Sequence, residues 1–350
     1  MLSIKQKLKQ NTADLYPAYF ALVMSTGIVS LATSIFNYSG IARILLYLNI
    51  VFYSSLWLLL LMRVYFHAKL VLNDLGNHKT GAGFLTLIAG TCILGTQFII
   101  MFPNNPIALW LYFLGVALWL PLIYTFFSSI IIKQQKPSIE HGIDGSWLLI
   151  VVAIESISIL GTRLWHNNIV TGRTLELFNL SMFALGCIFY ILLITLILYR
   201  LIFFRLKAED YVPNYWINMG AVAIITLAGA ELILTHSGLG ITVDFIPFIK
   251  GMILMFWILG TWWIPLILIL GIRQHICLKV PLTYHPQYWS LVFPLGMYTV
   301  CTFELGSILH SSAQIQLSTV FLFIALTAWF ITVTGLLRRI YSTLISRQLK

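Results

Sequence analysis

The chain has 350 residues, of which 59% are hydrophobic and 9% are charged, and its formal net charge is +10. Soluble domains contain roughly 45–50% apolar and about 25% charged residues, so this composition excludes an ordinary soluble protein and indicates an integral membrane protein. The length suffices for about ten membrane spans joined by short connections.

Ten apolar segments follow one another along the chain, each long enough to cross a bilayer as a helix. They are expected near Tyr16–Phe36, Ile41–Tyr65, Gly83–Met101, Pro106–Ile132, Gly145–Thr162, Thr174–Phe204, Tyr215–Ser237, Ile246–Gly271, Pro286–Leu309 and Gln314–Ile340. The predicted fold class is an all-α integral membrane protein with ten transmembrane helices arranged as five helical hairpins. Residues 16–340 are expected to form a single transport domain between a cytoplasmic N-terminal segment, 1–15, and a cytoplasmic C-terminal tail, 341–350.

Lysine and arginine are distributed unevenly between the two sets of connections. The termini and alternate connections hold Lys5, Lys7, Lys9, Arg63, Lys69, Lys79, Lys133, Lys136, Arg200, Arg205, Lys207, Arg273, Lys279, Arg338, Arg339, Arg347 and Lys350, whereas the other side holds Arg43, Arg163, Arg173 and Lys250. The positive-inside rule then places both termini in the cytoplasm of a multi-pass protein of the cell membrane. A basic cytoplasmic rim suits anionic membrane lipids, so the net charge does not call for nucleic acid as a partner.

The odd-numbered segments contain small and polar residues, whereas the even-numbered ones are mostly Leu, Ile, Phe and Trp. This contrast predicts odd helices that form an inner pore with a polar axis, surrounded by an outer ring of even helices that faces lipid. The candidate pore-lining residues are Ser25, Thr26, Gly27, Gly90, Gly95, Gln97, Thr299 and Thr302.

Three acidic residues, Glu155, Glu231 and Glu304, lie well inside odd segments, and no Lys or Arg is expected at their depth. An ionised acid at mid-bilayer costs about 2.5–3.5 kcal/mol on insertion scales, so each must face the interior, carry a proton or pair with a cation. Two interpretations stay open: one or more acids titrate and couple transport to protons, or each is a neutral carboxyl group that holds helices together.

The ninth segment is unusual because the apolar run from Tyr288 to Gly306 contains Pro294 and Gly296. Proline removes a helix hydrogen bond and glycine admits a neighbouring backbone, so a helix kink is expected here, with ordinary packing as the alternative. Phe293 beside them is a candidate apolar constriction, since such constrictions close pores by dewetting.

Motifs of enzymes and cofactor sites do not appear in the sequence. The four cysteines form no CxxC pair, the eight histidines show no HxxxH or HExxH spacing, and there is no P-loop and no GxSxG. We therefore expect no enzymatic activity, no catalytic residue, no cofactor and no metal.

Three stretches resemble the tellurite-resistance/dicarboxylate transporter family, which includes the slow anion channels and the malate permeases. They are PAYFALVMSTGIVS at Pro17–Ser30, GTWWIPLILILGIRQH at Gly260–His275 and FPLGMYT at Phe293–Thr299. The resemblance implies five hairpins around a central pore, assembly as a homotrimer, and conduction of anions or carriage of dicarboxylates. It also implies that a phenylalanine of the ninth helix occludes the pore, and Phe293 is the matching position, with Phe303 on the same helix as the alternative.

The sequence therefore predicts transport of a small anionic substrate or an organic acid, such as malate or a tellurite-type anion, through a pore gated by a phenylalanine. Acids in the pore would repel a permanently charged anion, so cotransport with a proton is left open. One rival is a proton-coupled exporter of cationic or neutral toxic compounds that uses the intramembrane glutamates. A second rival, an intramembrane enzyme or sensor, lacks any nucleophile and base at a suitable spacing.

Overall fold

The computed structural model describes residues 9, 12–103, 105–170, 172–205, 213–235 and 241–348. Every regular element among these residues is helical, and ten helices are long and apolar enough to cross a membrane. The predicted fold class, an all-α membrane protein with ten spans, is therefore confirmed. Four of the residues that were used to predict the orientation lie outside the described residues: Lys5, Lys7, Lys207 and Lys350.

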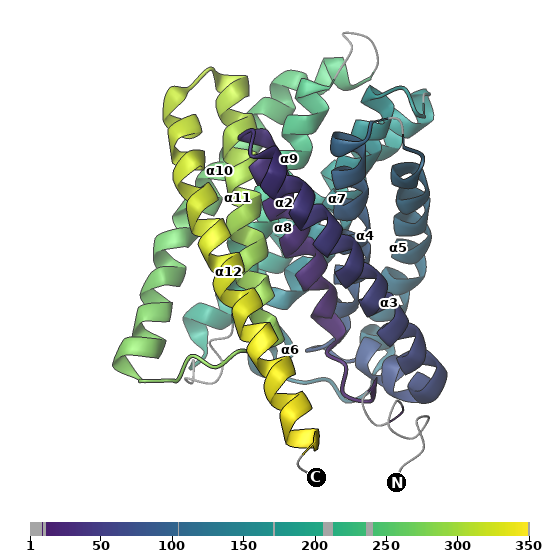
Figure 1. Ribbon diagram of the computed structural model, residues 1–350. Coiled ribbons are helices and arrows are strands. Elements are labelled where there is room, and N and C mark those ends of the chain that lie inside the picture. The colour runs from purple at the N-terminus through teal and green to yellow at the C-terminus, as the bar shows by residue number, and fades with distance from the viewer. Residues whose placement is uncertain are drawn as a thin grey trace.

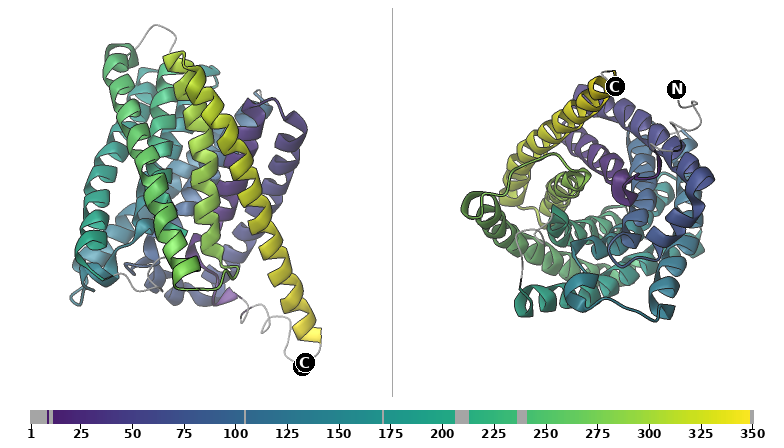
Figure 2. Two further views of the ribbon diagram at one scale, coloured as in Figure 1. Left: turned by 90° about the vertical axis from the view of Figure 1, so that its left-hand side faces the viewer. Right: turned by 90° about the horizontal axis from the view of Figure 1, so that it is seen from below.

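The ten long helices alternate between buried and exposed (Figures 1 and 2). The buried set consists of α2 (Ala21–Ile35), α4 (Thr86–Met101), α7 (Leu149–His166), α9 (Ile217–Leu234) and α11 (Trp289–Leu309). The exposed set consists of α3 (Ser39–Leu75), α5 (Ile107–Ile132), α8 (Arg173–Phe203), α10 (Thr242–Ile272) and α12 (Ser312–Gln348). A short helix, α6 (Ile139–Gly142), lies between α5 and α7.

The buried helices form a closed inner ring, because α2 contacts α4, α4 contacts α7, α7 contacts α9, α9 contacts α11, and α11 contacts α2. Each of them also contacts the exposed helix that follows it in the chain. Within an 18-residue apolar window of each span, between 78% and 94% of the residues are buried for the inner helices, against 22% to 44% for the outer ones. The view from below in Figure 2 shows this arrangement of one ring inside another. The difference follows from composition, since Leu-rich and Ile-rich surfaces are stable against lipid and small residues are needed where helices meet closely.

Glycines of the inner helices lie at the closest of these contacts. A Cβ on Gly220 of α9 would lie 2.7 Å from Cγ of Pro294 on α11, and one on Gly296 of α11 would lie 2.7 Å from Ile28 of α2. Real Cβ atoms do not approach other atoms so closely, so glycine at these positions lets adjacent inner helices pack backbone to side chain.

A short 3₁₀ turn precedes every inner helix. The turns are η1 (Pro17–Phe20), η2 (Gly81–Leu85), η3 (Gly145–Leu148), η4 (Pro213–Trp216) and η6 (Pro286–Tyr288). They too contact one another in a closed ring, in the same order as the helices. Each begins with Pro or Gly and contains an aromatic residue, and proline suits a helix start because its missing N–H has no partner there. The fold thus contains five copies of one unit, a turn followed by an inner and an outer helix.

Two of the turns are capped by side chains. Oδ1 of Asp144 accepts a hydrogen bond from the Ser146 amide at 2.7 Å, and Nδ1 of His285 accepts one from the Gln287 amide at 3.3 Å. Burial and the neighbouring Arg339 lower the pKa of His285, so the neutral ring that can accept this bond is favoured.

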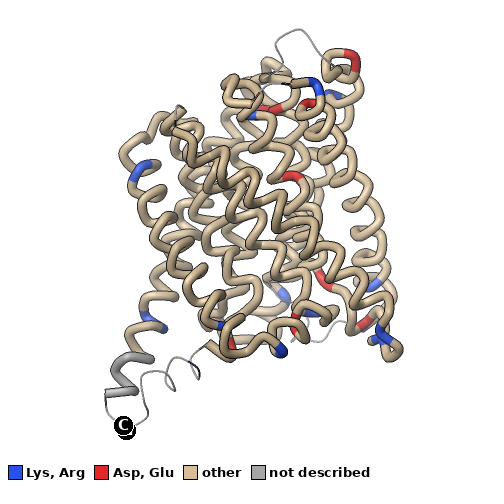
Figure 3. Tube along the Cα trace, turned by 90° about the vertical axis from the view of Figure 1, so that its right-hand side faces the viewer, with Lys and Arg blue, Asp and Glu red and all other residues tan. Residues whose placement is uncertain are grey.

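All inner helices begin at the ring of turns, which we call the turn end of the bundle, and finish at the opposite, distal end. The C-terminal part of α12 lies beyond the turn end (Figure 1). Figure 3 shows Lys and Arg gathered mainly at this end and a smaller group of charges at the distal end. The cytoplasmic location of the turn end stays a prediction.

The close contact at Gly220 gives the first testable prediction. Gly220→Ala forces α9 away from Pro294 and should destabilise the protein by about 1–3 kcal/mol, the usual cost of overpacking. Gly251→Ala is the matched control, since Gly251 lies in α10 with nothing within 4 Å of an added Cβ. Thermal unfolding of the two purified variants should show a lowered midpoint for Gly220→Ala alone. Equal midpoints would mean that the inner ring tolerates expansion at this contact.

Candidate functional site

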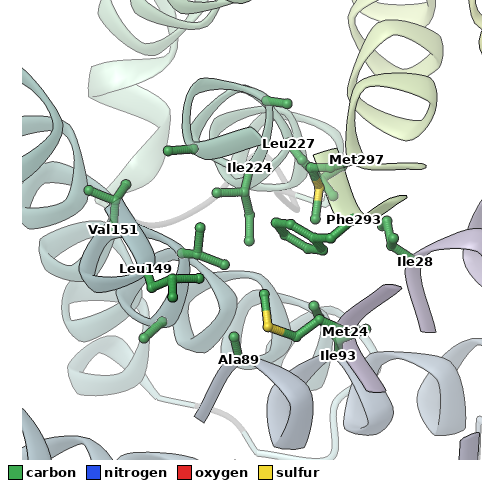
Figure 4. Close-up of a cluster of buried hydrophobic side chains, with 14 of the residues drawn as sticks. Met24, Ile28, Ala89, Ile93, Leu149, Val151, Ile224, Leu227, Phe293 and Met297 are labelled. Atoms are coloured by element: carbon green, nitrogen blue, oxygen red, sulfur yellow. The ribbon is translucent and has the colours of Figure 1, made fainter. Parts of the chain in front are cut away.

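The axis of the inner ring is filled by apolar side chains around Phe293. Figure 4 shows the Phe293 ring, 1% exposed, in a cluster to which all five inner helices contribute. We call this group the axial cluster; its labelled members are Met24, Ile28, Ala89, Ile93, Leu149, Val151, Ile224, Leu227, Phe293 and Met297. The bundle is therefore apolar and closed at this level, where the sequence had led us to expect a polar axis.

A small cavity lies on the distal side of Phe293. Its volume is about 20 Å³, room for roughly one water molecule. All five inner helices line it, and the polar residues of its lining are Thr96, Ser156, Arg163 and Glu231. The cavity thus lies on the axis between the axial cluster and the charged groups at the distal end.

Arg163 and Glu231 form an ion pair at the distal side of this cavity. Nη2 of Arg163 in α7 donates to Oε1 of Glu231 in α9, with the side chains 22% and 2% exposed. Glu304 of α11 interacts electrostatically with both residues. Two of the three acids predicted from the sequence therefore meet at the same end of the axis.

The expectation that no Lys or Arg lies at the depth of the acids was wrong. Arg163 was assigned to a connection because the apolar run stops at Thr162, but α7 continues to His166. A positional signal could have found the pair. Arg163, Glu231 and Glu304 each lie eighteen residues after the first residue of their turn, namely Gly145, Pro213 and Pro286. Parallel helices with equal spacing place these three residues at one level.

Glu155 lies apart from this cluster. Its side chain is fully buried in α7 and packs against α8, where a Cβ on Gly186 would overlap it. Neither carboxyl oxygen has a hydrogen-bond partner within the described part of the chain. Glu155 therefore belongs to the contact between an inner and an outer helix, away from the axial cavity.

The polar residues predicted to line a pore bond mainly to neighbouring helices. Ser25 donates to the Trp289 carbonyl at 2.8 Å, which joins α2 to α11. Three others connect the inner ring to the outer one: Thr26 accepts from Trp329 at 3.0 Å, Gln97 accepts from Asn49 at 2.6 Å, and Thr302 accepts from Trp257 at 2.9 Å. Thr299 donates to the Leu295 carbonyl of its own helix at 2.9 Å.

The glycines of that set lie at helix contacts as well. Gly27 faces Ile93, Gly90 faces Val23, and Gly95 faces Leu160. None of the eight predicted lining residues is among those that line the axial cavity as the structure describes it. Their role in lining an open pore stays a prediction.

The predicted kink residues lie in a helix that runs without interruption from Trp289 to Leu309. Pro294 packs against Gly220, and Gly296 packs against α2. The kink stays a prediction, and the packing alternative has direct support in these contacts. The other candidate gate residue, Phe303, packs edge-on against Phe36 near the distal end of α2, with ring centroids 5.3 Å apart.

Comparisons with known proteins agree with the architecture. The SLAC1 family model, described as a voltage-dependent anion channel, matches residues 14–337. An uncharacterized transporter of Methanocaldococcus jannaschii is 24% identical over 343 residues, which cover 93% of this chain and 94% of the relative. An uncharacterized membrane protein of Mycobacterium tuberculosis is 33% identical over 156 residues, 44% of this chain and 78% of the relative.

The Arg163–Glu231 pair leads to a prediction about stability. Arg163→Met leaves the Glu231 carboxylate buried without its cation and should destabilise the protein by about 3–5 kcal/mol. The double variant Arg163→Met/Glu231→Leu removes both charges and should recover most of that loss, because an apolar replacement of a buried ion pair is often neutral. Thermal unfolding of the purified variants measures both effects. A double variant less stable than the single one would contradict this account of the pair.

Proposed function

Because this chain belongs to the SLAC1 family of voltage-dependent anion channels, we propose that it moves small anions across the membrane along the axis of its inner ring. Moving a bare anion through hydrocarbon costs tens of kcal/mol by Born estimates, so a path enclosed by protein is required. The closed ring of five buried helices supplies an enclosure that lipid does not reach.

Phe293 is the proposed gate of this path. The observation that carries the proposal is its position in the axial cluster, where side chains of all five inner helices surround one aromatic ring (Figure 4). A passage this narrow and apolar excludes water, and an anion without water or polar partners cannot cross it. Opening then requires that the Phe293 ring leave the axis.

The arginine beyond Phe293 favours anions as the transported class. Arg163 lines the distal cavity together with Glu231, Thr96 and Ser156, and the two hydroxyl groups donate to the Cys92 and Ala153 carbonyls of their own helices. The guanidinium donors of Arg163 replace part of the hydration of a chloride, a nitrate or a carboxylate. Organic acids such as malate are included because a guanidinium presents two parallel donors to a carboxylate. We also propose, from the family resemblance, that the protein is a homotrimer in the cell membrane with its turn end in the cytoplasm.

Export of cationic or neutral toxic compounds is the rival function. It would need a carboxylate free to bind the compound or a proton. Glu231 already pairs with Arg163 and Glu155 packs against an outer helix, which leaves Glu304 as the acid available for that function. The Arg163 guanidinium at the cavity supports the anion proposal over the rival. Flux of labelled malate compared with flux of a lipophilic cation into proteoliposomes separates the two.

Replacement of the gate residue tests the proposal. Phe293→Ala removes the ring from the axial cluster and should raise anion conductance at least about tenfold, since a wider and wetter constriction lowers the barrier to the ion. Phe303→Ala is the matched control on the same helix, because Phe303 packs against Phe36 at the distal end. Recordings in planar bilayers with chloride or malate measure both variants.

Equal conductance of Phe293→Ala and Phe303→Ala would show that Phe293 is not the gate. Absence of anion current from wild type and both variants, together with uptake of the lipophilic cation, would favour the export function.

A further inference from the structure

The contacts of Arg163 use only part of the hydrogen-bonding capacity of its guanidinium. One nitrogen, Nη2, donates to Glu231, whereas the buried Nε–H has no hydrogen-bond partner among the described residues. A guanidinium offers five N–H donors in a planar fork, which matches the oxygen atoms of nitrate or a carboxylate. The same side chain lines the distal axial cavity, so its unused donor capacity lies on the proposed path.

We propose that Arg163 is an anion-binding residue of the path, and that the Glu231 carboxylate and the transported anion compete for its guanidinium. This inference rests on the proposed function, because it concerns the same axis. In the closed molecule Glu231 acts as a resident anion. An incoming anion binds when it displaces that carboxylate from Arg163.

The charges around the pair set the conditions for this exchange. When all three groups are ionised, Arg163, Glu231 and Glu304 together carry a net charge of −1, which repels an approaching anion. A proton on Glu304 brings the cluster to neutrality. Anion binding is therefore linked to the charge on Glu304.

The other titratable groups described at the distal end have partners or positions of their own. His166 of α7 bonds through Nδ1 to the Thr235 carbonyl at 3.1 Å. Glu176 of α8 accepts a hydrogen bond from the Thr242 amide at 2.8 Å. Arg43 near the start of α3, Arg173 at the start of α8 and Lys250 of α10 are exposed. Asp244 lies in the first turn of α10, and His310 follows the last residue of α11. Among the charged residues of the distal end, Arg163 and Glu231 line the cavity. The exchange is therefore between the Glu231 carboxylate and the anion at Arg163.

A purely structural salt bridge between α7 and α9 is the alternative. Such a bridge would affect stability when broken but would leave anion affinity and its pH dependence unchanged. The two roles are therefore separated by measurements of anion binding as well as unfolding.

The test uses nitrate as the probe and two measurements on each variant. The first is the half-saturating nitrate concentration for flux into proteoliposomes, with Phe293→Ala as the background. The second is the nitrate-dependent rise in the unfolding midpoint of the purified protein. Glu231→Gln removes the competing charge, so the half-saturating concentration should fall at least about fivefold. Arg163→Gln/Glu231→Gln should lose the nitrate response in both measurements.

Two further variants keep the test decisive. Glu304→Gln leaves the ion pair intact and removes one nearby charge, so it should lower the half-saturating concentration at neutral pH and flatten its pH dependence, even if the Glu231 variants fail to assemble. Arg173→Gln removes a positive charge from an exposed site at the same end and should leave nitrate binding unchanged.

The outcomes for this site and for the proposed function are distinct. If Phe293→Ala passes nitrate but Arg163→Gln/Glu231→Gln binds and transports it like its parent, or if Glu304→Gln keeps the parent's pH dependence, the role of Arg163 is wrong. If nitrate stabilises Glu231→Gln and not the double variant, while none of the variants transports nitrate, the binding site stands and the transport proposal fails.

Discussion

The structure depends on the requirement that polar groups inside a membrane find partners within the protein. Water is absent there, so an unpaired hydroxyl, amide or charge costs several kcal/mol. In the inner ring this requirement is met largely by bonds between helices, such as Ser25 to the Trp289 carbonyl and Trp329 to Thr26. These bonds turn polar side chains toward neighbouring helices. The axis is left to Phe293 and the apolar residues around it.

The same requirement explains what the sequence could and could not reveal. Ten spans and their alternation of buried and exposed helices were predictable, because lipid contact and close helix packing demand different residue types. The direction of a single side chain was not, since successive residues of an α-helix are rotated by about 100° and composition does not show which face meets the axis. Glu155 and Glu231 illustrate this, because both lie in odd helices, yet one packs against an outer helix and the other lines the axial cavity.

Arg163 was missed for a different reason. A charged residue ends an apolar run, so hydropathy places the helix boundary in front of it even where the helix continues. The fivefold repetition corrects this, because equivalent positions in the five units can be compared. The residues eighteen positions after the start of each turn are Ile35, Ile99, Arg163, Glu231 and Glu304. The last three units therefore have a charged residue at the position where the first two have isoleucine. Charged residues at a position that is apolar in the other units indicate a special role.

In the proposed function, the axial cluster and the charged residues Arg163, Glu231 and Glu304 meet two different demands of ion passage. An apolar constriction sets whether an ion passes, because it imposes a barrier of dehydration on every ion, whatever its sign. A charge beside the path sets which ions approach, because the Coulomb energy changes sign with the ion and is large where the effective dielectric constant is low. A guanidinium left unpaired at that depth would hold an anion too tightly for release, whereas a guanidinium shared with Glu231 offers a site whose strength the competing carboxylate limits. Conduction requires binding of that intermediate strength.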